Sequence, residues 1–217
     1  MKILALRCGI LLLATITLFG LTGCGSYNQL VTLENNVNKK WADVQSVYQR
    51  RADLIPNLVS TVQGAANFEK STLTEVTNAR ASVGQVKLDP NKAPTDAAQL
   101  EQFQAAQGQL SNALSRLLVV SENYPQLRAT EAFQALQAQL EGTENRISVE
   151  RNNFNAAVQE YNTYMQRFPT NMLNKMFGFK ERPFFAAQAG SEKAPGVKFD
   201  FNTPAPAVPA ATAAPTP

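Results

Sequence analysis

Apolar residues recur at helical spacing along most of the chain. From Leu30 to Val62 they are separated mainly by three or four residues, which is the repeat of one face of an α-helix. The pattern loses register over residues 64–70 and resumes one position out of phase at Leu73. A slip of this kind indicates either a local distortion in one long helix or a turn between two helices.

A loop and a further helix follow. Residues 87–95 (KLDPNKAPT) combine two prolines with turn-forming aspartate and asparagine, so they predict a loop. Thr95 or Asp96 is placed to cap the next helix. That helix should end near Glu122, because Tyr124 precedes a proline and is therefore biased away from helical geometry.

The last long helix has the clearest repeat. It is predicted to run from Thr130 to Phe168, with Pro169 closing it. Spacing by seven residues is typical of long helices that pack at shallow angles, as in coiled coils. The residues of this seam are Phe133, Leu140, Ile147, Phe154, Tyr161 and Phe168.

These patterns predict an all-α fold, an elongated antiparallel bundle of long helices over residues 30–185. We favour four helices with a turn within residues 64–67, because one unbroken helix over residues 26–83 would be longer than the helices that pack against it. The alternative is a three-helix bundle whose long first helix is unbroken.

Charged residues interrupt the apolar seams of the first and last helices. In the seven-residue series that begins at Leu30, Arg51 takes a core position between Val44 and Leu58. A buried charge is unfavourable unless it is paired, so we expect a buried polar layer where the two interruptions meet. Such a layer fixes which helices pair and in what register. Its predicted members are Arg50, Arg51, Asp53, Glu144, Arg146 and Glu150.

Three roles are open for this layer. It can be purely structural. It can also bind a ligand or partner beside Pro56, which removes one helical hydrogen bond and is expected to kink the helix. In the third interpretation Glu144 or Glu150 acts as an acid or base on an envelope glycan or lipid, which also requires a cleft.

The sequence contains no histidine. This excludes nucleophiles paired with histidine, and the histidine-bearing zinc and di-iron sites that are built on helices. The sequence also has no phosphate-binding loop motif. Carboxylate chemistry, or a loose Mg²⁺ or Ca²⁺ site made of oxygen ligands, remains open. We nevertheless expect no catalytic residue, no metal site and no cofactor.

The first residues have the layout of a bacterial lipoprotein signal. Lys2 and Arg7 precede an apolar run over residues 10–21, which is too short for an ordinary membrane span. Leu-Thr-Gly-Cys follows and ends at Cys24, which resembles a lipobox, where cleavage leaves the cysteine as an acylated N-terminus. With Cys8 removed and Cys24 acylated, no free thiol would remain.

Acylation would tether the protein to a membrane on the periplasmic side of the envelope. Residues 1–23 are then the signal peptide, and residues 24–29 are the lipidated cysteine with a short tether. Gly25 rather than aspartate follows Cys24, so we expect the outer membrane rather than the inner one. Of 20 basic and 17 acidic residues, two basic ones would leave with the signal. The nearly neutral remainder is not expected to bind nucleic acid.

An apolar cluster and a Pro/Ala-rich tail end the chain. Residues 171–185 are dense in methionine and phenylalanine, with Lys175, Lys180 and Arg182 among them. Either they cap the open end of the bundle, or they contact a membrane or partner, to which aromatic residues flanked by cations are suited. Residues 186–217 cannot bury a core and are predicted to be disordered. The candidates for contact are Met176, Phe177, Phe179, Phe184 and Phe185.

Two motifs resemble those of the LemA family of bacterial envelope proteins. One is RRADLIPNLV at residues 50–59, and the other runs from TENRI at residues 143–147 to the Phe-Pro pair at residues 168–169. The resemblance covers about residues 27–185 and implies an all-helical bundle carried by an N-terminal membrane anchor. Many family members keep an uncleaved membrane helix there, whereas this sequence has a lipobox.

The resemblance also bears on function. The family has no established enzymatic activity, and magnetosome membrane-assembly proteins include a related domain. A non-enzymatic scaffold, adaptor or membrane-organising protein is therefore implied, with another envelope protein as its expected partner. The alternative is a carboxylate-dependent envelope hydrolase or lyase, and a third interpretation is a stress sensor whose helices rearrange.

Overall fold

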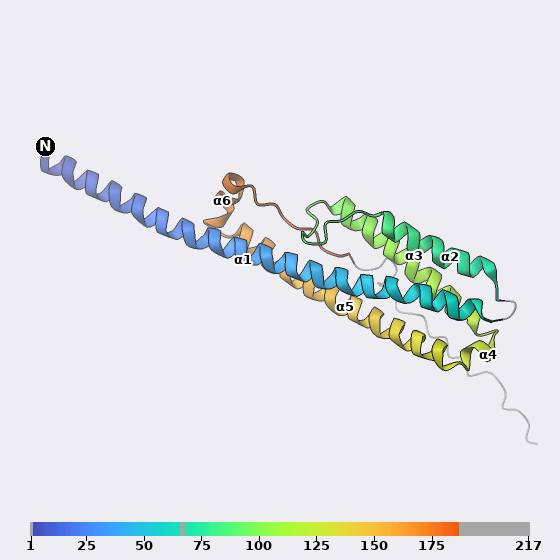
Figure 1. Cartoon of the computed structure of the whole chain (residues 1–217). Helices are drawn as coiled ribbons and strands as arrows, with labels where there is room; N and C mark the ends of the chain where they lie inside the picture. Colours follow the sequence, from blue (N-terminus) through green and yellow to red (C-terminus); the bar gives the residue numbers. More distant parts are fainter. Residues whose placement is uncertain (1, 66–67, 187–217) are drawn as a thin grey trace, which may run out of the picture. The chain divides into compact units, whose positions relative to one another are not determined.

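The computed structural model describes residues 2–65 and 68–186, with side chains from Gly25 onward apart from those of residues 173 and 175. All regular structure in this part of the chain is helical, so the all-α prediction is confirmed (Figure 1). Four helices are long and two are short. They are α1 (Lys2–Gln63), α2 (Lys70–Gln85), α3 (Ala97–Ser121), α4 (Pro125–Arg128), α5 (Glu131–Gln166) and α6 (Thr170–Phe177).

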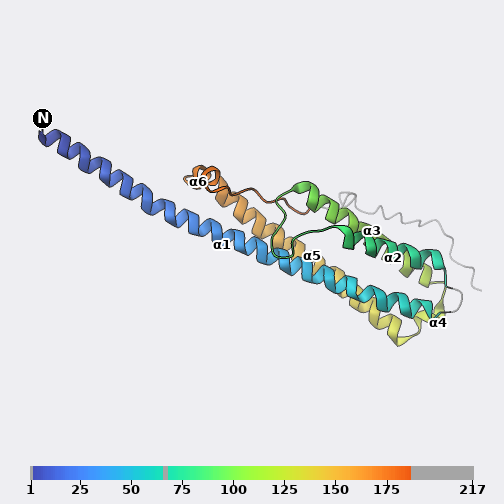
Figure 2. The same ribbon diagram turned by 45° about the horizontal axis from the view of Figure 1, so that its top comes forward.

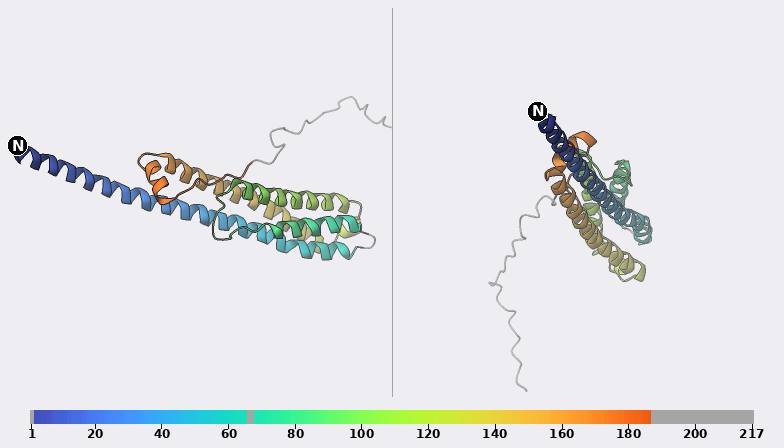
Figure 3. Two further views of the ribbon diagram at one scale, coloured as in Figure 1. Left: turned by 90° about the horizontal axis from the view of Figure 1, so that it is seen from above. Right: turned by 90° about the vertical axis from the view of Figure 1, so that its left-hand side faces the viewer.

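The four long helices form an antiparallel bundle. α1 and α5 lie side by side, and α2 pairs with α3 in the same way (Figures 1 and 2). Each long helix runs opposite to the one before it, and the short α4 makes the turn between α3 and α5 (Figure 3). α6 contacts α1 and α5 at the end of the bundle away from α4. These two ends are called the α6 end and the α4 end below.

The predicted turn between two helices is present. α1 ends at Gln63 and α2 begins at Lys70, so the slip in the apolar pattern marks a change of helix, and the unbroken first helix of the alternative does not occur. The predicted caps are also present. Asp96 accepts a hydrogen bond from the backbone N–H of residue 98 at 3.0 Å, and Thr130 accepts one from residue 133 at 3.4 Å.

α5 ends earlier than predicted. Its last residue is Gln166, and Phe168 is 74% exposed instead of lying in the seam. Arg167 has an extended backbone with ψ of 146°. Phe168 precedes a proline, and such a residue is biased away from helical geometry. The chain instead forms α6, which the sequence patterns did not predict.

The buried apolar residues fall into two groups. The group at the α6 end surrounds Trp41, and the group at the α4 end surrounds Leu58. Burial of one such large side chain stabilises the fold by about 1.5–3 kcal/mol relative to exposure. Arg51 lies between the two groups along α1. The rings packed against Trp41 are those of Phe103, Phe154 and Phe185, at centroid distances of 5.7, 5.7 and 6.1 Å.

Among the described residues, no helix carries an apolar stretch that qualifies as a membrane span. The predicted acylation of Cys24 concerns a side chain outside the described set. Residues 187–217, which make up nearly all of the predicted tail, also lie outside the described residues. The lipoprotein signal, the tether and the disordered tail therefore stay predictions.

Candidate functional site

Arg51 is buried where α1, α3 and α5 meet, with 2% of its side chain exposed. Its Nη1 donates hydrogen bonds to Glu144 at 2.6 Å and to Ser111 at 2.9 Å. Its Nη2 donates to the side-chain and backbone carbonyls of Gln107. Because Glu144 belongs to α5 and the other two residues to α3, one guanidinium connects three helices. Glu144 is itself 54% exposed, so water screens the ion pair, whereas a buried hydrogen bond from the guanidinium to Gln107 contributes about 1.5–3 kcal/mol.

The other four residues predicted for this layer lie outside it. Asp53 is exposed and accepts a hydrogen bond from a glutamine one turn earlier in α1. Glu150 accepts one from an asparagine on its own helix. Arg50 and Arg146 are exposed and line a shallow groove between α1 and α5. One residue along a helix is a rotation of about 100°, which turns Arg50 to solvent although Arg51 is buried.

Gln107 and Ser111 were missed because they are uncharged, although Gln107 leaves a signal in the sequence. It stands within the apolar face of α3, between Phe103 and Leu110. A polar residue at such a core position requires a polar partner on a facing helix. Reading this position together with Arg51 would have placed α3 in the layer.

Both carboxylates considered for catalysis already have an interaction partner within the protein. Glu144 forms an ion pair with Arg51, and Glu150 accepts a hydrogen bond from an asparagine on its own helix, α5. Within the described side chains, no group of three or more metal-ligating residues is placed to hold an ion. The layer is therefore arranged to join helices.

Pro56 lies inside α1, which continues past it to Gln63. Proline has no N–H, so the carbonyl of Ala52, four residues earlier, loses its helical partner. Arg80 of α2 supplies a replacement, since its Nε donates to that carbonyl at 3.2 Å. The missing hydrogen bond of α1 is thus used to fasten α2 to it.

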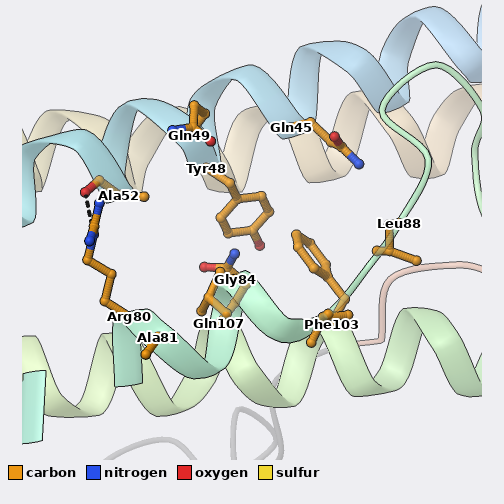
Figure 4. A pocket seen from close by; sticks show the side chains of 12 residues that line it. Gln45, Tyr48, Gln49, Ala52, Arg80, Ala81, Gly84, Leu88, Phe103 and Gln107 are labelled. Carbon is orange, nitrogen blue, oxygen red and sulfur yellow. Dashed lines mark hydrogen bonds between the residues drawn. The ribbon is translucent and has the colours of Figure 1, made fainter. Parts of the chain in front are cut away.

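A pocket opens beside this contact, between α1, α2 and α3 (Figure 4). Its volume is about 390 Å³. Tyr48, Phe103 and Gln107 are buried residues in its lining, and Arg80 and Gly84 line it from α2. Burial raises the pKa of Tyr48 above 10, against the opposing charges of two arginines. The phenol therefore stays protonated at neutral pH and serves as a hydrogen-bonding group.

α6 carries exposed apolar side chains. Met172, Met176 and Phe177 are 61%, 68% and 50% exposed, and Phe168 just before the helix is 74% exposed. These four residues are called the α6 surface. The side chain of Asn174 donates to a backbone carbonyl near the end of α5 at 2.7 Å, which fixes the rotation of α6.

Tyr27 connects α6 to the start of the bundle. Its ring centroid lies 4.9 Å from that of Phe177 and 5.8 Å from that of Phe179. Tyr27 follows Cys24 by three residues, a helical rise of about 4.5 Å. The α6 surface therefore lies next to the position at which the predicted anchor joins the bundle.

The five residues predicted to contact a membrane or partner have different environments. Met176 and Phe177 belong to the α6 surface, and Phe184 is 48% exposed. Phe179 packs partly buried against the core. Phe185 is buried and stacks on Trp41, so it closes the core at this end.

Residues 178–186 form a non-helical strap that follows α6 (Figure 1). Arg182, one of the cations among the apolar residues of this segment, is buried, with 2% of its side chain exposed. It pairs with Glu34 of α1 and donates to the carbonyl of Ala93 at 2.6 Å. Its backbone exchanges two hydrogen bonds with the side chain of Asn162, at 2.9 and 3.0 Å.

A second buried tyrosine lies beside the strap. Tyr161 donates from its hydroxyl to the carbonyl of Lys180 at 3.1 Å. Burial, followed by the negative charge of Glu34, raises the pKa of Tyr161 to about 12, against the effect of Arg182. The hydroxyl is thus held as a neutral donor that keeps the strap against α5.

Comparison with protein families gives a match to the LemA family over residues 40–199, which is most of the chain. The chain belongs to the LemA family. The matched span contains the Arg51 layer, the pocket and the α6 surface. All three are therefore features of the LemA domain in this protein.

Relatives of this LemA protein include magnetosome proteins. Magnetosome protein MamQ 2 of Paramagnetospirillum magneticum is 27% identical over 178 residues, covering 73% of this chain and 64% of the relative. Magnetosome protein MamQ of Magnetospirillum gryphiswaldense is 28% identical over 174 residues, with the same coverage. Protein LemA of Metamycoplasma hominis is 22% identical over 157 residues, covering 72% of this chain and 67% of the relative. The chain thus spans 64% of the length of the magnetosome proteins.

Proposed function

We propose that this LemA protein is a membrane-tethered, non-enzymatic scaffold or adaptor of the bacterial envelope, with its α6 surface at the membrane. The observation that carries the proposal is the contact between Tyr27 and Phe177, whose ring centroids lie 4.9 Å apart. It brings exposed apolar side chains next to the predicted anchor. Such side chains are stabilised where a bilayer interface removes them from water.

The chemistry of the α6 surface fits a lipid interface. Met172 and Met176 are one helical turn apart on the same side of α6, and both are largely exposed. The neighbouring Lys180 is exposed and can attract anionic headgroups. Flexible methionine side chains adapt to irregular apolar surroundings. A surface of this kind adds a second, weaker attachment to a lipid anchor.

The proposal holds for two forms of the anchor. Acylation of Cys24 would place acyl chains about 4.5 Å along the helix from Tyr27. An N-terminal membrane helix of the kind that many family members keep would also bring Tyr27 close to the membrane surface. We favour the acylated form, on the periplasmic side and at the outer membrane, because of the lipobox and the glycine at position 25.

The α4 end would then point away from the anchor and present its helices to a partner. Relatives named as magnetosome proteins, with no enzyme among the names given above, support an organising role. The interactions that Glu144 and Glu150 make within the protein support it too. Changing Glu144 to glutamine separates the two functions: an enzyme would keep its fold and lose its activity, whereas a structural layer would lose stability together with function. Changing Glu150, which lies outside the layer, should lower activity only in an enzyme.

In-cell photo-crosslinking tests the proposal. A photoreactive residue at Phe177 should capture lipid, and one at Val119, which is 64% exposed on α3, should not. Phe184 lies in the strap next to Phe185, which stacks on Trp41, so a photoreactive residue there reports a partner at the side of the bundle. A reproducible protein adduct in addition would identify the partner of an adaptor. Adducts to lipid alone would support a membrane-surface protein without a partner. Equal lipid capture at Phe177 and Val119 would contradict the proposed orientation.

A further inference from the structure

The pocket between α1, α2 and α3 has the features of a small-molecule site and is separate from the α6 surface. Its volume of about 390 Å³ lies within the range of ligand pockets, which is roughly 300–1,000 Å³. Tyr48 and Phe103 give it an aromatic floor, with ring centroids 5.1 Å apart at nearly a right angle (Figure 4). Its polar lining determines what it can bind.

Gly84 lines one side of the pocket, and it has no side chain to occupy the space there. It lies within α2, where glycine is less stable than alanine by about 0.5–1 kcal/mol. A Cβ atom at this position would meet no other atom within 4 Å. Packing therefore does not require glycine here, and a larger side chain can be placed at this lining position without a clash at its base.

Gln107 presents hydrogen-bond donors to the pocket. Arg51 has donors only, so the amide oxygen of Gln107 must face it, and the amide nitrogen is left on the other side. Within the described part of the chain, that nitrogen has no hydrogen-bond partner. Figure 4 shows the Gln107 side chain directed into the pocket. The buried layer thus fixes the orientation of a donor in the pocket lining.

Arg80 adds a positive charge. Its Nε is used by the carbonyl of Ala52. The remaining guanidinium N–H groups have no partner in residues 2–65 and 68–186, and no carboxylate lines the pocket. An arginine with free donors in a pocket that no carboxylate lines is suited to a carboxylate ligand.

The lining also offers an acceptor. The amide nitrogen of Gln49 donates to Asp53 at 2.7 Å, so its oxygen remains available. The pocket therefore combines a cation, amide donors and acceptors, and aromatic surface. Together these are complementary to a terminal carboxylate, to peptide groups and to an apolar side chain.

We propose that this pocket binds a short peptide with a free C-terminal carboxylate and an apolar side chain. The carboxylate pairs with Arg80, the peptide groups bond to Gln107 and Gln49, and the apolar side chain packs on Phe103 and Tyr48. The proposal does not depend on the location of the α6 surface. A pocket of this volume accommodates a ligand of two or three residues.

Titration calorimetry with the full chain in detergent tests this. The probes are acetyl-alanyl-phenylalanine and its C-terminal amide. The acid should bind in a saturable manner, and the amide should bind at least about tenfold more weakly, because it lacks the charge that Arg80 pairs with. Arg80→Gln should reduce the affinity for the acid to that for the amide.

A matched pair of glycine variants locates the site. Gly84→Leu should abolish binding by filling the pocket. Gly108→Leu is the control, because Gly108 is also helical, a Cβ there meets nothing within 4 Å, and it does not line the pocket. The control should bind the acid as the unmodified protein does. Unchanged binding by Gly84→Leu, or no saturable binding of the acid by the unmodified chain, overturns the proposal.

Discussion

Among the residues whose side chains the structure describes, two arginines are buried, and they stabilise different parts of the protein. Arg51 and Arg182 are 2% and 3% exposed overall, and each pairs with one glutamate. The partners of Arg51 lie on α3 and α5, so it joins helices that form the bundle. The partners of Arg182 include a loop carbonyl at Ala93, and it holds a strap that has no helical hydrogen bonds of its own.

This difference separates global from local stability. Three long helices meet at the Arg51 layer, so moving one of them away leaves Arg51 or Gln107 without its partner in the interface that remains buried. The strap can detach from the bundle while the long helices stay paired. Local opening of this kind requires less free energy than global unfolding.

The largest expected effect is that of Arg51→Ala. It removes the connection between three helices and leaves a cavity with the Gln107 carbonyl unsatisfied, so the free energy of unfolding should fall by about 2–4 kcal/mol. Urea unfolding followed by circular dichroism measures this. Arg50→Ala is the matched control, because Arg50 is exposed, and it should change stability by less than about 0.5 kcal/mol. Equal losses for the two variants would refute the buried layer.

Arg182→Ala should have a smaller global effect, a loss of about 2 kcal/mol, because the strap opens locally. Chymotrypsin should then cut rapidly next to Phe184, while cleavage elsewhere stays slow. Lys180→Ala is the control, since only the backbone carbonyl of Lys180 holds the strap. If the cleavage rate next to Phe184 did not rise in Arg182→Ala, the strap would not depend on the arginine.

The two arginines also differ in how far the sequence could predict them. Arg51 interrupts an apolar series of seven-residue spacing, so its burial was predicted, and Gln107 leaves a comparable signal in α3. Arg182 lies in a segment without a repeat, and nothing local marks it as buried. Its environment depends on residues 20 to 148 positions away.

The same distinction explains which other features of the structure the sequence predicted and which it did not. Long helices and their caps follow from local patterns, so the turn after Gln63 and the Asp96 cap were predicted. α6 is short and follows a proline, and its methionines recur one turn apart as core residues do, although they are exposed. The pocket depends on which faces of α1, α2 and α3 meet, and its amide lining carries no charge pattern that points to a site.

The contact between Tyr161 and the strap can be tested through the pH dependence of the free energy of unfolding. Its folded pKa of about 12 lies above the ordinary value of 10. The neutral form is favoured in the folded state, so this stabilisation is complete below pH 10 and is lost as the pH rises toward 12. Unfolding free energies at about pH 9 and about pH 11 should differ by about 1 kcal/mol more in the unmodified protein than in Tyr161→Phe. An identical difference would mean that the hydroxyl is not held as described.

The smallest effect concerns the link between α1 and α2. Arg80→Ala should lower the unfolding free energy by about 1 kcal/mol, because the carbonyl of Ala52 loses its donor. With Pro56→Ala already present, the new backbone N–H serves that carbonyl, and the loss should fall below about 0.5 kcal/mol. A double-mutant cycle in urea measures the coupling. Equal losses in both backgrounds would show that Arg80 does not replace the missing helical hydrogen bond.

The location of the α6 surface is tested most directly by fluorescence quenching in liposomes with brominated lipids. The chain has one tryptophan, Trp41, which is buried and provides an internal reference. In the reconstituted full chain, the F177W variant should gain emission that brominated lipids quench strongly. The matched V119W variant should gain emission that they leave unchanged. Equal quenching in the two variants, or none in F177W, would contradict a membrane-facing α6.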